Sequence, residues 1–87
     1  MSSQKITSGN LIRAARAGIG WTQDALAEKA GVHVQAVKHR ERSHAISPEQ
    51  ATGHAVQKIT NALGRAGVEF HAEPVPGITF REVADAR

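Results

Sequence analysis

Residues 21–41, WTQDALAEKAGVHVQAVKHRE, decide the fold of this chain. Leu26 and Ala30 are four positions apart, so they share one face of a short helix. Gly31 follows directly, and glycine is the residue that best tolerates the left-handed conformation that ends a helix. A second apolar pattern, marked by Val37, begins immediately afterwards. The segment therefore predicts two short helices joined by a glycine turn.

The start of the first of these helices is marked by two independent signals. Thr22 can cap it, and Asp24 lies in the first turn, where a negative charge suits the helix dipole. Trp21, just before the cap, and Leu26, four residues after it, have the spacing of a hydrophobic staple. These features predict a helix over about residues 23–30.

The second helix is expected from about His33 to Glu41 or Arg42. Its start is less clearly marked, because histidine is a poor residue for capping a helix. Val37 faces the core beside Val32, which leaves the opposite side of this helix turned outward. Two helices joined by such a turn form a helix-turn-helix, whose second helix can lie in the major groove of DNA.

Two further helical segments flank this pair. One is expected from about Ser8 to Ala17, capped by Thr7 or Ser8. Its apolar stripe is Leu11, Ala14, Ala15 and Gly18. The other begins at residues 47–50, SPEQ, which combine a capping serine, proline at the first helical position and glutamine at the capping-box position. Gly53 can divide this helix in two. Its stripe is Ala51, Ala55, Ile59, Ala62, Leu63 and Ala66.

The end of the chain changes from helical to alternating patterns. Apolar and polar residues alternate over 68–72 and again over 78–81, and the turn-rich EPVPG of residues 73–77 lies between them. The pattern predicts two short strands. Because a lone two-stranded ribbon is barely stable in water, it should pack on the helices or pair with the ribbon of a second chain. In either case Phe70 and Phe80 are expected to be buried.

Size and composition limit the class of protein. The chain has 87 residues, which make one small domain, and it contains no cysteine. Disulfide frameworks, thiolate metal sites and cysteine nucleophiles are therefore excluded. No apolar run approaches the ~20 residues of a membrane span, and residues 1–10 lack the build of a signal peptide. The sequence thus predicts a cytoplasmic protein that does not enter a membrane.

The distribution of charge is more informative than the net charge of +3. Residues 1–65 hold nine Lys and Arg against four Asp and Glu, a net charge of +5, whereas residues 66–87 hold two against four, or −2. A basic body of this kind suits a polyanionic partner. Arg13 and Arg16 could reach the backbone of such a partner, but they are expected to be solvated surface residues.

The sequence contains no constellation of residues for catalysis or metal binding. There is no glycine-rich phosphate loop, no nucleophile beside a plausible base and no useful pair of carboxylates. The five histidines show no i, i+4 pair and have no cysteine to assist them, so no metal site is expected. We therefore expect neither enzymatic activity nor a cofactor.

Three segments match one known family: residues 11–16 (LIRAAR), 20–23 (GWTQ) and 26–32 (LAEKAGV). Together with the sequence up to Phe70, they resemble the Cro/C1-type (XRE) helix-turn-helix regulators of bacteria and phages. The resemblance implies an all-α domain of four to five helices with a short C-terminal β ribbon. The chain accordingly divides into a DNA-binding domain, residues 1–67, and a short β tail, residues 68–87, and we expect residues 68–83 of this tail to form a dimer contact.

The resemblance also implies which residues contact DNA. Gln23 corresponds to a glutamine that touches a phosphate, and Arg42 is placed for another phosphate. Base contacts fall on the helix that follows His33: Gln35 can pair with adenine, Lys38 or His39 can donate to guanine, and Val34 can meet a thymine methyl group. The complete set is Gln23, His33, Val34, Gln35, Lys38, His39 and Arg42.

The second helix departs from the family pattern at three positions. His33 replaces the usual serine or threonine at the cap, and Ala36 replaces a threonine. Arg40 stands where an apolar residue usually closes the core. Either its head group extends to Glu41 or to solvent, or the helix ends early or tilts.

These features predict a sequence-specific transcriptional regulator of double-stranded DNA, most often a repressor in proteins of this size. A half-site of about four or five base pairs gives too little selectivity, so a two-fold homodimer is expected. Two alternatives stay open. One is the antitoxin of a toxin–antitoxin pair, which also grips a partner protein. The other is a helix-turn-helix adaptor that binds only protein.

Overall fold

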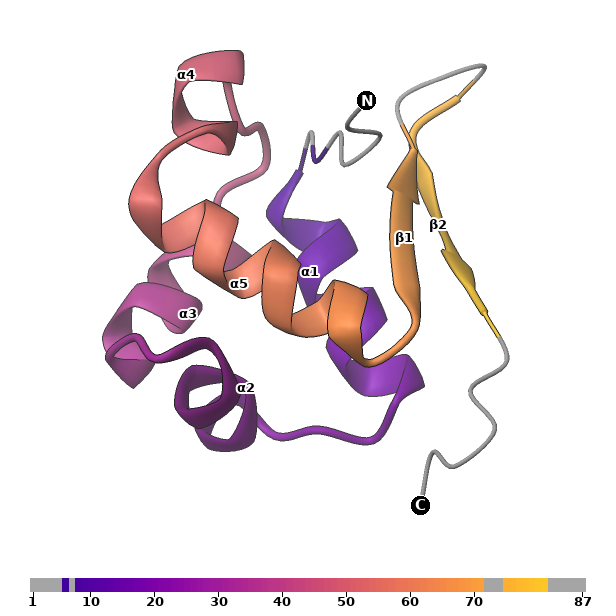
Figure 1. Ribbon diagram of the computed structural model, residues 1–87. Coiled ribbons are helices and arrows are strands. Elements are labelled where there is room, and N and C mark those ends of the chain that lie inside the picture. Colours follow the sequence, from indigo (N-terminus) through magenta and orange to yellow (C-terminus); the bar gives the residue numbers. More distant parts are fainter. Residues whose placement is uncertain (1–5, 7, 72–74, 82–87) are drawn as a thin grey trace.

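The computed structural model describes Ile6, residues 8–71 and residues 75–81, and these residues form five helices and two strands (Figure 1). In chain order the elements are α1 (Gly9–Gly18), α2 (Gln23–Ala30), α3 (Val34–Glu41), α4 (Pro48–Ala51), α5 (His54–Arg65), β1 (Val68–His71) and β2 (Gly77–Phe80). The expected all-α fold with a short C-terminal ribbon is confirmed. The alternative cap Thr7, Ala72 of the predicted strand and residues 82–87 of the β tail lie outside the described residues.

The helices begin and end where capping residues predict. Thr22 Oγ1 accepts a hydrogen bond of 3.0 Å from a backbone N–H in the first turn of α2, and Gly31 ends this helix with a φ of 74°. Ser47 and Gln50 form a complete capping box at α4, because each side chain accepts from the other's backbone N–H, at 3.1 and 2.9 Å. The anticipated break is also present, with Gly53 as the N-cap of α5.

One hydrophobic core lies between the helices and the inner face of the ribbon. Trp21 packs against this core from its edge and Leu26 is fully buried within it, as the predicted staple requires. α5 runs across the middle of the molecule and contacts α1, α2, α3 and β1 (Figure 1). The buried hydrophobic residues are Ile6, Ile12, Ala15, Leu26, Ala27, Val37, Ile46, Val56, Ile59, Ala62, Leu63, Val68 and Phe70.

The apolar stripe of α1 differs from the predicted one. The buried residues are Gly9, Ile12 and Ala15, three positions apart, whereas Ala14 and Gly18 are exposed. The larger Ile12 occupies the core position, so the buried face of the helix is rotated from the one expected.

The stripe of α5 is also shifted. Val56 is fully buried although the predicted stripe omits it, while Ala55 is partly exposed. The physical reason is the break at Gly53, which starts a new helix with its own rotation. Val56 then aligns with Ile59 and Leu63 on the face turned to the core.

β1 and β2 form an antiparallel ribbon that packs on the helices. Val68 pairs with Phe80 and Phe70 pairs with Ile78, so these side chains share one face of the ribbon. Val68 and Phe70 are buried, but Phe80 is 47% exposed, which contradicts the expectation that it is buried within one chain. The reason is that β2 is the outer strand (Figure 1), and only part of the Phe80 ring is covered where it lies over Gly18 at the end of α1.

Candidate nucleic-acid interface

α3 turns one face to the core and the other to solvent. Val37 is fully buried and Glu41 is 5% exposed, so these two residues fix the rotation of the helix. On the other side, Gln35 and His39 are exposed and Lys38 is partly exposed. Val34, three positions before Val37, lies at the margin of this patch and is partly buried against the core. We call this patch the reading face; it consists of Val34, Gln35, Lys38 and His39.

His33 caps α3, so the expectation that this helix is poorly capped is wrong. Its Nδ1 accepts a hydrogen bond of 3.0 Å from the backbone N–H of Gln35. An imidazole nitrogen can therefore replace the hydroxyl that usually serves at this position. Because Nδ1 is the acceptor, the neutral ring carries its proton on Nε2. The side chain is exposed, and this second nitrogen can donate to an anion.

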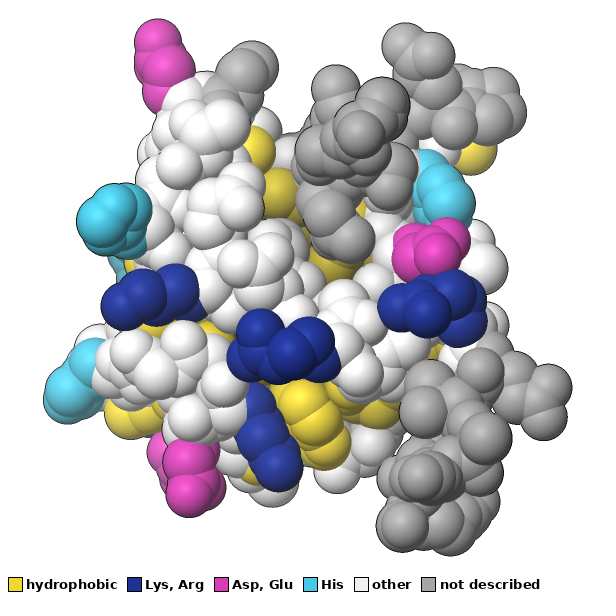
Figure 2. All heavy atoms as spheres, viewed as in Figure 1, with side chains coloured by type: hydrophobic (Ala, Val, Ile, Leu, Met, Phe, Trp, Pro, Cys, Tyr) yellow, Lys and Arg dark blue, Asp and Glu magenta, His cyan; other side chains and the backbone are white. Residues whose placement is uncertain are grey.

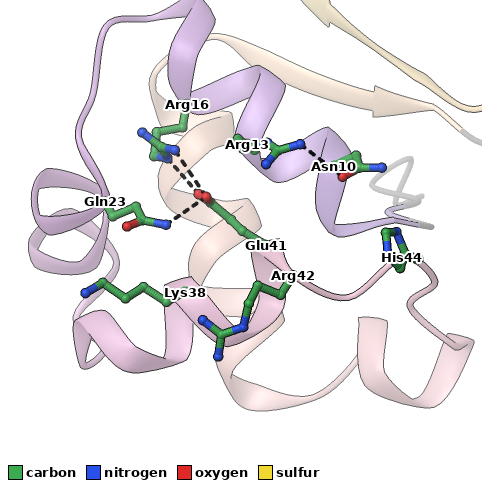
Figure 3. Close-up of a pocket in the computed structure, with 8 residues that line it drawn as sticks. All are labelled: Asn10, Arg13, Arg16, Gln23, Lys38, Glu41, Arg42 and His44. Atoms are coloured by element: carbon green, nitrogen blue, oxygen red, sulfur yellow. Dashed lines mark hydrogen bonds and ion pairs between the residues drawn. The ribbon is translucent and has the colours of Figure 1, made fainter.

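A buried network holds α3 against the two preceding helices. The Arg16 guanidinium donates to both carboxylate oxygens of Glu41, from Nε to Oε2 at 2.6 Å and from Nη2 to Oε1 at 3.1 Å. Gln23, at the start of α2, donates from Nε2 to Oε1 at 3.0 Å. Arg16 also donates from Nη1 to the carbonyl oxygen of Trp21 at 2.9 Å. Planar, charge-assisted contacts of this kind fix geometry strongly, so α1, α2 and α3 are held in one arrangement (Figure 3).

Sequence reasoning missed this network. Arg16 was expected to be solvated, yet its side chain is 16% exposed and that of Glu41 is 3% exposed. The two residues are 25 positions apart, so no local spacing connects them. The available signal is that Glu41 follows the core residue Val37 by four positions, which places its carboxylate on the buried side of the helix.

A cationic groove opens beside the network (Figure 3). It has a volume of about 620 Å³ and lies between α1, the start of α2 and the end of α3. Arg13, Lys38 and Arg42 bring positive charge to it, while the carboxylate of Glu41 is neutralised by Arg16. Such a groove suits a phosphate group. Its lining residues are Asn10, Arg13, Arg16, Gln23, Lys38, Glu41, Arg42 and His44.

The predicted contact residues lie in two adjoining places, the cationic groove and the exposed part of α3. Gln23, Lys38 and Arg42 line the cationic groove, although the amide of Gln23 is engaged by Glu41. Of the remaining ones, His33 lies at the start of α3, Gln35 and His39 lie on its outer side, and Val34 lies at the margin of that side, partly buried against the core. Lys38 belongs to both places and connects them. Asn10, Arg13 and His44 also line the groove and were not singled out from the sequence as contact residues.

Arg40 neither shortens α3 nor pairs with the neighbouring carboxylate. The helix continues through Glu41, whose carboxylate binds Arg16, and the Arg40 side chain is partly exposed. The backbone carbonyl of Arg40, in contrast to its side chain, contacts the start of α1. Gly9 approaches it so closely that an added Cβ would overlap the carbonyl oxygen. Gly9 also donates its N–H to the Ser43 carbonyl at 2.8 Å, which joins the start of α1 to the end of α3.

The face of the molecule on which α5 lies has a different character. Lys and Arg side chains are spread across it among uncharged and hydrophobic surface, and Asp, Glu and His side chains lie toward its edges (Figure 2). Among the residues that the structure describes, no three or more His, Cys, Asp or Glu are grouped so as to hold a metal ion. None of the described helices has both the length and the hydropathy needed to cross a membrane.

Comparison with known proteins agrees with this geometry. A family model described as helix-turn-helix matches residues 12–70, a range that contains the turn at Gly31, the buried network and all the predicted contact residues. No curated protein matches the chain significantly. The chain belongs to the Cro/C1-type (XRE) helix-turn-helix family of DNA-binding regulators.

Proposed function

We propose that this protein is a sequence-specific transcriptional repressor that binds double-stranded DNA as a homodimer and reads the major groove with α3. The observation that carries the proposal is the continuity between the reading face and the cationic groove. A helix in the major groove has base edges along one side and the sugar-phosphate backbone along its flank. The reading face offers hydrogen-bonding and apolar groups to the base edges, and the cationic groove offers positive charge to the sugar-phosphate backbone.

The reading face supplies the groups that distinguish base pairs. The Gln35 amide can donate to and accept from adenine at once, and Lys38 and His39 can donate to guanine, while Val34 can contact a thymine methyl group. α3 has eight residues, which at about 1.5 Å per residue span about 12 Å. This length corresponds to roughly four base pairs, at about 3.4 Å each.

The cationic groove supplies the phosphate contacts. Arg13, Lys38 and Arg42 provide cations there, and His33 offers Nε2–H close to the start of α3. In a dimer three cations per subunit give about six phosphate contacts, so the logarithm of the affinity should fall with the logarithm of salt concentration with a slope of about −5. Residues 1–67 would make these contacts, and the β tail, residues 68–87, would join the two subunits.

Selection of bound sequences from random duplex DNA with the full chain tests this function. The expected result is a palindromic consensus with half-sites one helical turn, or a multiple of it, apart. A single unrepeated half-site would contradict the homodimer. Absence of salt-sensitive binding to any duplex would overturn DNA recognition and favour the adaptor. Co-purification of a small unrelated protein that binds the tail would instead favour the antitoxin.

A further inference from the structure

A second pocket lies outside the cationic groove, where the end of α2 meets the end of α5. We call it the tryptophan pocket; it has a volume of about 240 Å³ and is lined by Trp21, Lys29, Ala62, Arg65 and Ala66. None of these residues lines the cationic groove or belongs to the reading face. The pocket is therefore a separate site, which the proposed contacts with DNA do not use.

The tryptophan pocket combines an apolar interior with a cationic rim. Ala62 is buried and Ala66 is partly buried, and the short side chains of these two residues leave the space open. The partly buried Trp21 adds an aromatic wall. Lys29 and Arg65 are exposed, and Lys and Arg side chains border hydrophobic surface on the face where α5 lies (Figure 2).

The two cations of the rim are held close to each other. The Lys29 ammonium lies over the Trp21 ring, 5.9 Å from its centroid, and Arg65 donates from Nη2 to the Lys29 carbonyl oxygen at 3.3 Å. Within the described part of the chain, neither cation forms an ion pair with a carboxylate, and the adjacent Glu28 does not line the pocket. The last turn of a helix favours each cation separately, but it does not account for the apolar space beside them.

We propose that the tryptophan pocket binds an acidic segment of a partner protein, with one large apolar side chain in the pocket and carboxylates paired with Lys29 and Arg65. The volume indicates the size of the occupant. Pockets that enclose a whole small molecule measure about 300–1,000 Å³, so 240 Å³ suits a single side chain. The charge indicates its neighbours, because a cationic rim attracts an acidic segment and repels a basic one.

The apolar interior favours a protein over a second DNA duplex as the occupant. A duplex approaches with phosphate groups, which need cations and hydrogen-bond donors. Lys29 and Arg65 would serve such groups, but Ala62 and Ala66 offer them nothing. A protein segment uses both parts of the pocket, and tryptophan and arginine are among the residue types that most often dominate the binding energy of protein interfaces.

Selection from a random peptide library that lacks tryptophan, with the full chain as the target, tests this proposal. The expected consensus is a large apolar residue flanked by Asp and Glu. Binding of a selected peptide should change the fluorescence of Trp21, which is the only tryptophan in a chain without tyrosine. Failure to enrich any peptide, a consensus without acidic residues, or binding seen by calorimetry with unchanged fluorescence would overturn the proposal.

Three substitutions test the rim and the interior separately. Lys29→Ala and Arg65→Ala each remove one exposed cation, and each should raise the dissociation constant of the selected peptide about tenfold. Ala66→Leu fills the interior and keeps both cations, and it should weaken binding by a similar factor. Lys58→Ala, which removes an exposed cation of α5 outside the pocket, is the matched control and should have no effect.

Two results with these variants would contradict the proposal. If Lys58→Ala weakens binding as much as Lys29→Ala does, the peptide is attracted by net charge alone. If Ala66→Leu keeps its fold by circular dichroism and binds the peptide like the parent, no side chain enters the pocket.

The same variants distinguish a partner protein from a second duplex. Lys29→Ala and Arg65→Ala should leave the affinity for the selected DNA site unchanged. If they weaken binding to unrelated duplex DNA as much as Arg13→Ala does, this face binds the DNA backbone and the proposal fails. A parent protein that binds the peptide but no duplex at any salt concentration would refute the proposed function and leave the assignment of the pocket intact.

Discussion

Replacement of the buried carboxylate Glu41 by glutamine should destabilise the protein and loosen α3. Glu41→Gln preserves volume but leaves the Arg16 guanidinium without its anion. Breaking a fully buried pair in this way costs about 3–5 kcal/mol. Because the Arg16 side chain is 16% exposed and keeps some solvation, we expect a decrease of about 2–3 kcal/mol in the free energy of unfolding. For a domain of this size the melting temperature should fall by about 10–20 °C.

A double-mutant cycle measured by urea denaturation tests the pair itself. Arg16→Gln and Glu41→Gln are combined, and the double variant should be at least about 1 kcal/mol more stable than the sum of the single effects predicts, because it leaves no isolated charge. Arg13→Gln, on the same helix but exposed, is the matched control and should change stability by less than about 0.5 kcal/mol. Additivity of the two substitutions within about 0.3 kcal/mol would refute the reasoning.

Three further substitutions probe the backbone positions that hold the helices, each by urea denaturation. Gly9→Ala should lower the free energy of unfolding by about 1–3 kcal/mol, because its Cβ would overlap the Arg40 carbonyl oxygen; an unchanged midpoint would show that α1 and α3 are not in close contact. Gly31→Ala should cost about 1–2 kcal/mol because φ is 74° there, and a stabilising effect would contradict the left-handed turn. Ser47→Ala should cost about 1 kcal/mol by removing the acceptor for the Gln50 N–H, and no loss would mean that the capping box is not formed in solution.

The helix boundaries could be predicted from sequence because the interactions that set them are local. Thr22 bonds to a group three residues away, Gly31 is favoured by its own φ, and Ser47 and Gln50 satisfy each other within one turn. The cap at His33 was not anticipated. Its imidazole nitrogen accepts a hydrogen bond from a backbone N–H in the first turn, as a serine or threonine hydroxyl would. The general preference of residue types for the N-cap position does not reveal this.

Contacts between distant segments could not be predicted in this way. The pair Arg16–Glu41 joins two helices across 25 residues, and Gly9 is small because a carbonyl from the end of α3 lies against it. The shifted stripe of α5 has a related cause, since its rotation depends on where the chain breaks at Gly53. These features depend on how the helices cross. The apolar periodicity of a single helix carries no information about that crossing.

The candidate site was predicted in part. Resemblance to the family indicated Gln23, Lys38 and Arg42, and the structure brings these three residues together in one groove. It did not indicate that Arg13 and His44 line the same groove, since they come from segments outside the helix-turn-helix. The contacts of the reading face with bases stay a prediction.

The most direct test of base reading by α3 is the discrimination of a Gln35→Ala/His39→Ala variant among duplexes. Both side chains are exposed, so the fold should survive, and His54→Ala/Lys58→Ala on exposed positions of α5 is the matched control. Binding is measured at fixed salt to the selected site and to each of its single-base-pair variants. We expect the α3 variant to lose about 1–3 kcal/mol of discrimination per lost contact, or about 5- to 150-fold, with unchanged affinity for unrelated DNA. If the variant ranks these duplexes as the parent does, with the same ratios of affinity, α3 does not read the bases.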